Sequence, residues 1–264
     1  MKPFIDSRLY VNKTTHKGWG IFTKEKIKKG TVVEVSIPAK IKYKEISEGN
    51  SKVYNWIYTG EPYSDLGTGF ASCINHGPKP NVGFYGENGF LVYHATRNIE
   101  ANEEICLDYG IEDWGKPEKK VVFNNKKLND YIYVDSRLYL DLSNPKNQSI
   151  KNLDSYLKRT LNSNLLYHVF AKENIAKDTV IEIAMCGIFE RKKCKVPKDS
   201  TLKALYYYDK KGKYFYLPFG YANLYAINEE RANVKARIIN QKFNITTRRN
   251  IRKGERLFLK SRTI

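Results

Sequence analysis

Hydrophobic positions along the chain occur in short runs rather than in long stretches. Residues 31–37 (TVVEVSI) and 89–94 (GFLVYH) are two such runs, rich in β-branched or aromatic residues and bounded by turn residues, which is typical of strands. Lys28-Lys29-Gly30 and Arg252-Lys253-Gly254 indicate glycine turns just before a strand. Helical patterns are few, and the best are residues 43–58 and 149–161. We therefore predict a mainly β architecture of several small sheets with few short helices.

Four segments of the first half recur in the same order in the second half. The pairs are Phe4–Val11 with Tyr133–Leu140, Gly20–Val35 with His168–Ile183, Ile74–Val82 with Ile227–Val234, and Arg97–Leu107 with Arg249–Leu259. The third pair matches loosely, and its second member aligns as one residue shorter. Four ordered matches are hard to obtain by chance. We predict one fold duplicated in tandem, with domains at residues 1–118 and 131–264 and a polar linker at 119–130.

Composition indicates a folded protein outside the membrane. The hydrophobic fraction of 41% is too high for wholesale disorder, and no apolar run reaches the roughly 20 residues that span a bilayer. The first residues do not resemble a signal peptide, so a soluble intracellular protein is expected. The four cysteines form no Cys-x-x-Cys pair, and Cys73 and Cys106 fit small buried residues in strands. Cys73-x-x-His76 lacks further ligands nearby, so we predict no metal site.

Positive charge is concentrated in the second half of the chain. Residues 1–120 carry 17 Lys and Arg against 15 Asp and Glu, whereas residues 121–264 carry 29 against 13. Such a surface attracts polyanions, nucleic acid first among them. The candidate contacts are Arg191, Lys192, Lys193, Arg248 and Arg249. A Lys-rich composition that serves solubility alone, on a scaffold with no partner of its own, is the alternative.

Three motifs of the first half occur in a specific order. They are Gly18-Trp19-Gly20, Asn75-His76 leading to Pro80-Asn81, and Glu104-Ile105 leading to Tyr109. Together they resemble the signature of SET-domain protein-lysine methyltransferases, and the run LGTGFA at 66–71 is similar to small free-standing viral and bacterial members. The resemblance implies a β-clip fold with a pseudo-knot at residues 75–81. It also implies S-adenosylmethionine as cofactor and a protein substrate, a histone tail or another Lys-rich protein, and hence the nucleus or a host nucleus if that substrate is chromatin.

The same resemblance assigns roles to individual residues. Gly18 and Gly20 let the backbone approach the methionine end of the cofactor, because neither has a Cβ, and Trp19 lies against it. Asn75 and His76 bind the cofactor, Asn75 through an amide that both donates and accepts. Tyr109 is the catalytic residue, whose hydroxyl holds the lysine nitrogen during an in-line displacement.

Further residues of the first half are expected around the reacting lysine. Tyr54 or Tyr58 forms a wall of the lysine channel, and Leu107 occupies the position that controls how many methyl groups are added. Since leucine brings no hydroxyl to hold a water molecule, we expect that more than one methyl can be added. Trp114 closes the cofactor pocket as an apolar lid. The cysteine-rich cluster of larger relatives is missing from the sequence, so no zinc is expected.

The second copy retains the apolar positions but not the motif residues. The replacements are Leu166-Tyr167-His168 for the glycine loop, Asn228-Glu229 for Asn75-His76, Ala232 for Pro80 and Ser261 for Tyr109. We predict a degenerate, pseudo-SET copy that binds neither cofactor nor lysine and packs where small relatives place a second subunit. A non-catalytic SET-derived adaptor for chromatin or nucleic acid is the alternative for the whole chain.

Overall fold

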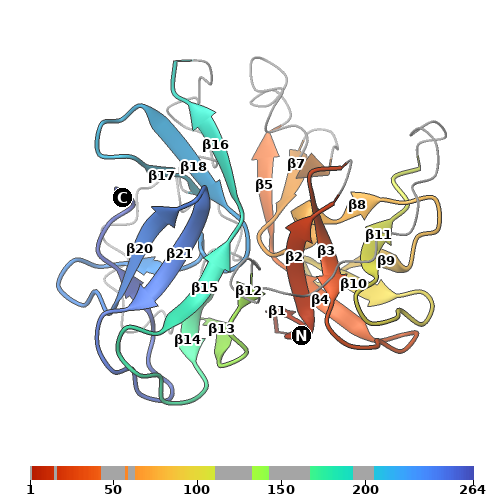
Figure 1. The fold of residues 1–264 in the computed structure, drawn as a ribbon, viewed down its shortest axis with the longest axis horizontal. Helices are drawn as coiled ribbons and strands as arrows, with labels where there is room; N and C mark the ends of the chain where they lie inside the picture. The colour runs from red at the N-terminus through yellow and green to blue at the C-terminus, as the bar shows by residue number, and fades with distance from the viewer. Residues whose placement is uncertain are drawn as a thin grey trace.

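The computed structural model describes residues 2–14, 17–42, 57–58, 63–110, 133–142, 167–192 and 205–264 (Figure 1). Strands dominate these ranges, and the one named helical element among them is a 3-10 turn, η1 (Ala71–Cys73). The mainly β prediction is therefore confirmed. One end of a predicted helix is wrong, because Ile57–Tyr58 forms strand β6. The rest of that helix and all of the helix predicted at 149–161 lie outside the described residues.

The first half contains three small sheets. Their strand orders are β1-β4-β10-β9, β2-β3-β11-β8 and β5-β7-β6. The strands not yet defined are β1 (Phe4–Ile5), β2 (Leu9–Lys13), β3 (Trp19–Thr23), β4 (Val32–Ser36), β5 (Pro38–Lys42), β7 (Tyr63–Gly67), β8 (Asn75–His76), β9 (Val82–Glu87), β10 (Phe90–Ala95) and β11 (Glu104–Leu107). All of their ladders are antiparallel except β8 with β11, which is parallel. That parallel pair brings two distant motifs side by side.

The second half contains sheets with the same relationships. The strand orders are β12-β15-β21-β20, β13-β14, β19-β22 and β16-β18-β17. The strands are β12 (Tyr133–Val134), β13 (Leu138–Leu142), β14 (Tyr167–Ala171), β15 (Val180–Ala184), β16 (Cys186–Glu190), β17 (Tyr207–Tyr208), β18 (Tyr214–Pro218), β19 (Ala226–Ile227), β20 (Val234–Ile239), β21 (Lys242–Thr247) and β22 (Phe258–Leu259). A bridge between Phe170 and Arg256 joins β14 to the segment that leads into β22. The β13-β14 and β19-β22 pairs thereby correspond to the sheet β2-β3-β11-β8.

The parallel ladders correct one sequence alignment. In the first half Asn75 and His76 lie opposite Cys106 and Leu107. In the second half Ala226 and Ile227 lie opposite Phe258 and Leu259. The positions equivalent to Asn75 and His76 are therefore Ala226 and Ile227, not Asn228 and Glu229. The loop that follows is one residue longer in the second half, not shorter, so a weak motif match was placed in the wrong register.

Left-handed backbone positions coincide in the two halves. Gly30 (φ +81°) and Gly254 (φ +78°) confirm the predicted glycine turns. Their counterparts in the opposite halves are Asp178 (φ +59°) and Asn102 (φ +64°), residue types that tolerate this conformation. The β9–β10 and β20–β21 hairpins likewise turn on Asn88-Gly89 and Asn240-Gln241, all with positive φ, as two-residue hairpin turns require. The halves therefore share turn geometry as well as strand pairing.

Two equivalent glycines meet where the halves join. Gly220 N donates a hydrogen bond of 3.1 Å to Gly69 O. Each glycine makes room for a buried carboxyl group, because a Cβ on Gly69 would lie 1.9 Å from Glu34 Oε1 and one on Gly220 would lie 2.5 Å from Glu182 Oε1. In the first half, Glu34 accepts from Ala71 N at 3.2 Å. In the second half, Glu182 accepts from Ala222 N, in the corresponding turn, at 2.9 Å. The two carboxyl groups thus hold the same turn on either side of the junction.

The apolar cores also cross the junction. One cluster contains Ile41, Leu66 and Phe70 from the first half together with Phe189 and Leu217 from the second. The other cluster combines Val35, Ile37 and Val92 with second-half residues that surround Phe243 and Ile245. Burial of apolar surface is the main favourable contribution to such an interface. The two halves therefore pack as one body (Figure 1).

Candidate active site

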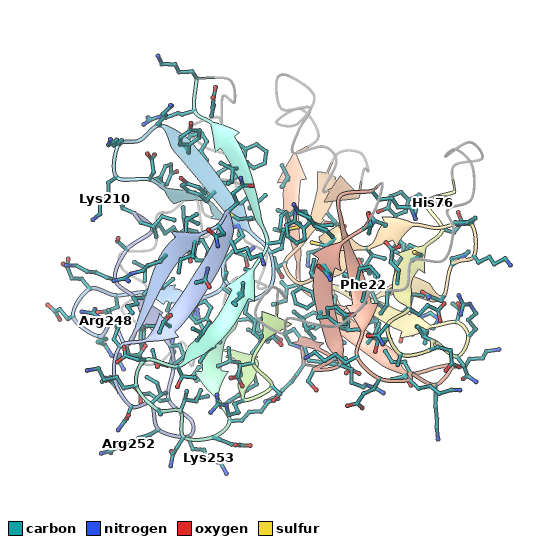
Figure 2. The ribbon with its side chains drawn as sticks, in the orientation of Figure 1. Phe22, His76, Lys210, Arg248, Arg252 and Lys253 are labelled. Atoms are coloured by element: carbon teal, nitrogen blue, oxygen red, sulfur yellow. The ribbon has the colours of Figure 1, made fainter. Side chains whose placement is uncertain are left out.

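Tyr109 follows β11 and lies against the β8 segment. Its backbone N donates to His76 Nδ1 at 3.2 Å, and its hydroxyl donates to the carbonyl oxygen of Ile74. The rings of Tyr109 and His76 are 5.7 Å apart at a tilt of 56°. The hydrogen bond to Ile74 holds the hydroxyl in place. The side chain remains accessible, because Tyr109 is 42% exposed. The structure thus brings together the last two sequence motifs (Figure 2, which labels His76).

Tyr109 is a neutral phenol at physiological pH. Burial, the largest cause, raises the pKa of its hydroxyl to about 12. The hydroxyl donates its hydrogen to Ile74 O, and a hydroxyl oxygen can also accept from an N–H group. The geometry suits a residue that positions an amine rather than one that removes its proton at neutral pH.

The glycine loop requires both of its glycines for different reasons. Gly18 has φ +80°, a conformation that L side chains rarely adopt, while a Cβ there would meet open space. A Cβ on Gly20 would lie 2.6 Å from Glu104 Oε1, 2.8 Å from Thr14 Cγ2 and 2.9 Å from Asn75 Nδ2. Gly20 therefore packs closely among three side chains, and a larger residue would displace them. Trp19 is half-buried, with Lys13 Nζ 5.5 Å from its ring centroid.

Asn75 connects this loop to the β11 motif. Its Nδ2 donates to Trp19 O at 2.9 Å and to Glu104 Oε1 at 2.8 Å. Both amide hydrogens are used, so Asn75 presents an acceptor toward a ligand rather than both a donor and an acceptor. Sequence reasoning gave Glu104 no role of its own, because its contact with Asn75 appears only once the chain is folded.

Asn81 is a second residue whose importance the sequence did not reveal. It is buried, its Nδ2 donates to Glu104 O at 2.8 Å, and its Oδ1 accepts from Cys106 N at 2.9 Å. Its Nδ2 also lies 3.2 Å from Glu103 Oε1, which is itself paired with Arg97. From the sequence, Pro80-Asn81 is expected only as part of the motif and of the pseudo-knot. The side chain instead holds β11, and with it Tyr109, beside β8.

The remaining predicted residues are placed as follows. Leu107 is buried at the end of β11. The backbone of Tyr58 lies in β6, while Tyr54 and Trp114 lie outside the described residues. Cys73 and Cys106 are buried as predicted, although Cys73 lies in the 3-10 turn rather than in a strand. Among the described residues no three His, Cys, Asp or Glu side chains gather as a metal site would need.

The predicted nucleic-acid residues do not form one cluster. Arg191 and Lys192 are exposed just after β16, and Arg191 N donates to Lys213 O at 2.9 Å. Arg248 and Arg249 follow β21, and Arg249 pairs with Glu255. Lys193 lies outside the described residues. Figure 2 shows Lys210, Arg248, Arg252 and Lys253 along the outer side of the second half.

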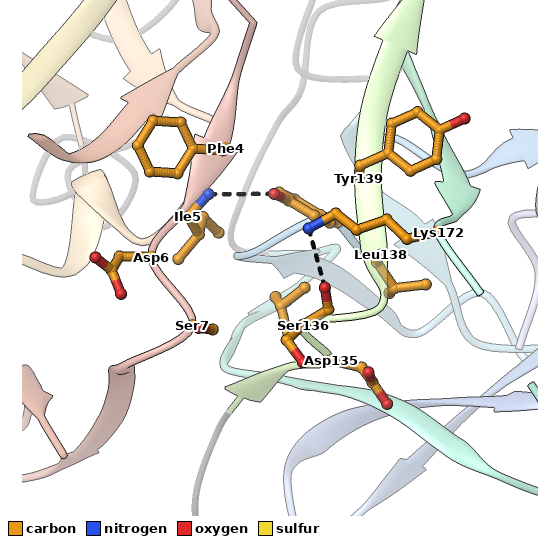
Figure 3. A pocket seen from close by; sticks show the side chains of 11 residues that line it. Phe4, Ile5, Asp6, Ser7, Asp135, Ser136, Leu138, Tyr139 and Lys172 are labelled. Carbon is orange, nitrogen blue, oxygen red and sulfur yellow. Dashed lines mark hydrogen bonds between the residues drawn. The ribbon is translucent and has the colours of Figure 1, made fainter. Parts of the chain in front are cut away.

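A cavity of about 450 Å³ lies away from Tyr109, at the junction of the halves (Figure 3). The equivalent segments Phe4–Ser7 and Val134–Ser136 line it together with Lys172. Its aspartates, Asp6 and Asp135, each hold the arginine two residues further along their own segment. Ile5 N donates across it to the hydroxyl of Tyr221 at 3.2 Å. The cavity contains none of the predicted site residues, and we place no chemistry in it.

Comparisons with known proteins agree with this geometry. The model of the SET domain matches residues 18–110. A histone-lysine N-methyltransferase of Schizosaccharomyces pombe, specific for H3 lysine 37, is 32% identical over 123 residues, which cover 44% of this chain and 82% of that protein. The chain belongs to the SET-domain family and is a protein-lysine methyltransferase.

One solved structure is also similar, a protein of Plasmodium falciparum described as a candidate histone methyltransferase. It is 28% identical, with a TM-score of 0.35, and the match covers 42% of this chain and 98% of that one. Among the described residues, no helix of the structure is long and apolar enough to cross a membrane.

Proposed function

We propose that the first half, residues 1–118, transfers a methyl group from S-adenosylmethionine to a lysine of a protein substrate. The observation that carries this proposal is the position of the Tyr109 hydroxyl. It donates its hydrogen to Ile74 O, directly before Asn75, and its oxygen can accept from a lysine amine. The matched residues 18–110 lie within this half.

The residues present fit the cofactor. No larger side chain fits at Gly20 without moving Glu104 or Asn75, and Asn75 would offer its amide oxygen to the amino end of the cofactor. Gly18 sets the turn of the loop, and His76 holds the backbone of Tyr109. Trp19 would lie against the cofactor, and Trp114, outside the described residues, is the proposed apolar lid. When bound, S-adenosylmethionine supplies a methyl group on a positively charged sulfur, open to in-line attack.

The lysine is held in a channel with an apolar wall. Leu107 is 2% exposed and has no hydroxyl that could hold a water molecule in place of a methyl group. Because this hydroxyl is missing, we expect that more than one methyl group can be added to the lysine. Tyr54 or Tyr58 stays the candidate for a wall of this channel. The lysine loses its proton to water, because desolvation and the nearby positive charge of the cofactor lower its pKa.

The substrate we propose is a histone tail or another lysine-rich protein. The S. pombe relative is specific for a histone H3 lysine, which supports a histone and, with it, the nucleus. The alternative is a non-catalytic adaptor, and the fit of Gly20, Asn75 and Tyr109 to one another weighs against it.

We propose further that residues 131–264 are a degenerate copy of the same fold that takes the place of a second subunit. The matched strand pairings, turns and buried Glu34 and Glu182 support a common origin. Ala226 stands for Asn75 and His168 for Gly20, so this half lacks the amide acceptor and the small residue of the glycine loop. Exposed cations such as Arg191 and Lys192 favour an additional contact with DNA.

The test is transfer of labelled methyl groups to histones and to a lysine-rich protein. The wild-type chain is expected to label at least one of them, and Tyr109→Phe to abolish labelling while its affinity for S-adenosylmethionine stays within about tenfold. Tyr85→Phe, an equally exposed tyrosine on β9, is the matched control and should keep full activity. A wild-type chain that neither binds the cofactor by calorimetry nor labels any substrate would favour the adaptor instead.

A further inference from the structure

Glu104 accepts a hydrogen bond from Asn75 and so sets the orientation of its amide. Its Oε1 accepts from Asn75 Nδ2 at 2.8 Å, and the Trp19 carbonyl accepts the other amide hydrogen at 2.9 Å. These two acceptors fix which way the amide points. The oxygen of Asn75 is therefore turned away from Glu104, and Glu104 holds this amide in its orientation.

The carboxylate of Glu104 packs against the glycine loop at Gly20. Its Oε1 is the atom closest to the position of a Gly20 Cβ, at 2.6 Å. The side chain is 20% exposed, so it is partly desolvated yet accessible. The ammonium of Lys17 lies 4.0 Å from its Oε2, which places one cation beside this carboxylate. Negative charge at this point of the glycine loop favours a cationic ligand group.

The second half carries the opposite charge at the equivalent position. Glu104 lies opposite Phe22 in the β3–β11 ladder, and Arg256 lies opposite Phe170 in the corresponding bridge. The Arg256 guanidinium is 4.9 Å from the Phe258 ring, and burial lowers its pKa to about 10. It therefore stays positively charged near neutral pH. The charge at this position is inverted between the halves.

The other two members of the site change together with Glu104. His168 fills the position of Gly20, and Ala226 that of Asn75. Burial and the Arg256 charge lower the pKa of His168 to about 4, so its ring is neutral. In the half without this glycine, the carboxylate is gone as well. The amide acceptor, the small loop residue and the negative charge are thus all present in the first half and all absent from the second.

We propose that Glu104 orients the cofactor by supplying the negative charge that faces the ammonium group at its methionine end, with Asn75 held by Glu104 as the neighbouring acceptor. This rests on the proposed function, since it concerns the cofactor of that site. Glu104 thereby distinguishes ligands that carry the amino-acid end from those that carry only the nucleoside.

Calorimetric binding of two ligands tests the role of Glu104. S-adenosylmethionine has the amino-acid end, and 5′-methylthioadenosine has only the nucleoside part. Glu104→Gln keeps an acceptor for Asn75 Nδ2 and removes the charge. It should weaken S-adenosylmethionine about tenfold or more, since hydrogen bonds to charged groups are the strong ones, and change 5′-methylthioadenosine by less than about twofold. Glu100→Gln removes the same charge from an exposed pair with Lys26 and should change neither affinity.

Each other outcome has a defined meaning. Equal binding of S-adenosylmethionine by Glu104→Gln and wild type would overturn the proposal, and so would an equal loss of both ligands, which indicates a structural role. If Glu104→Gln does not fold, Glu104→Asp, which keeps the charge, is compared with wild type at low and high salt. An affinity of Glu104→Asp that does not fall with salt would also overturn it. A wild-type chain that binds no S-adenosylmethionine would instead remove the proposed function.

Discussion

Asn81 and Asn233 make matching hydrogen bonds in the two halves. Asn81 Oδ1 accepts from Cys106 N at 2.9 Å, and Asn233 Oδ1 accepts from Phe258 N at 2.7 Å. In each half, the Nδ2 of the asparagine donates to the carbonyl oxygen of the residue two positions before the one whose N–H the Oδ1 accepts. It also donates to a glutamate that is paired with an arginine. Both side chains therefore hold the last strand of their half in place.

Replacing either asparagine by alanine should destabilise the chain. Buried backbone groups would lose their partners, which costs about 1–3 kcal/mol for each unsatisfied group. Chemical unfolding measures the loss. Asn81→Ala should also lower methyl transfer, because β11 leads to Tyr109, whereas Asn233→Ala at a permissive temperature should not. Equal loss of activity in both variants would contradict a site confined to the first half.

The two glycines of the loop should respond differently to alanine. Gly20→Ala places a Cβ within 2.9 Å of Glu104 and Asn75, so we expect at least about a tenfold loss of affinity for S-adenosylmethionine. Gly18→Ala meets no atom within 4 Å but has φ +80°, which costs about 1–2 kcal/mol of stability. Calorimetry and unfolding separate the two effects. Wild-type affinity in Gly20→Ala would exclude close contact between this part of the loop and the ligand.

The sequence predicted the class of fold and the identity of the motif residues, but not how they touch. Strand patterns and the repeat follow from alternation and turn residues, which act locally. The register of β19 against β22 does not, because Asn228 and Glu229 resemble Asn75 and His76 in sequence while the parallel ladder selects Ala226 and Ile227. The link from Glu104 to Asn75 spans 29 residues, so no local pattern encodes it.

Glu34 and Glu182 should make stability depend on pH. Burial, the largest cause, raises the pKa of each from its ordinary 4.5 to about 8. Between these values the unfolded chain releases a proton that the folded chain keeps, so the free energy of unfolding falls as pH rises from 4.5 to 8. Below this window the contribution is fully present. Above this window, the two groups no longer make the free energy of unfolding change with pH.

Urea unfolding at several pH values would measure this slope. Glu34→Gln and Glu182→Gln should each flatten it, because glutamine keeps an acceptor and does not titrate in this range. Glu100→Gln, at an exposed pair, is the control and should leave the slope unchanged. A slope that persists in the double variant would assign the pH dependence to other groups.

Charge reversal in the second half should reveal any binding of DNA. Arg191→Glu with Lys192→Glu changes two exposed cations, and Lys28→Glu with Lys29→Glu makes the same change in the first half. If Arg191 and Lys192 contact phosphates, the slope of log affinity against log salt falls by roughly two for the first pair. The second pair should leave it unchanged. Identical slopes in all three proteins would remove this patch as a DNA contact.

The hydrogen bond from Gly220 to Gly69 has a consequence for how the molecule assembles. Two subunits that met through such a contact would separate on dilution, since their association depends on concentration. Here both partners belong to one chain, and the linker keeps their effective concentration fixed. The midpoint of thermal unfolding should therefore be the same in dilute and in concentrated solution, and the enclosed Glu34 and Glu182 should remain shielded from water even in a cell that holds few copies of the protein.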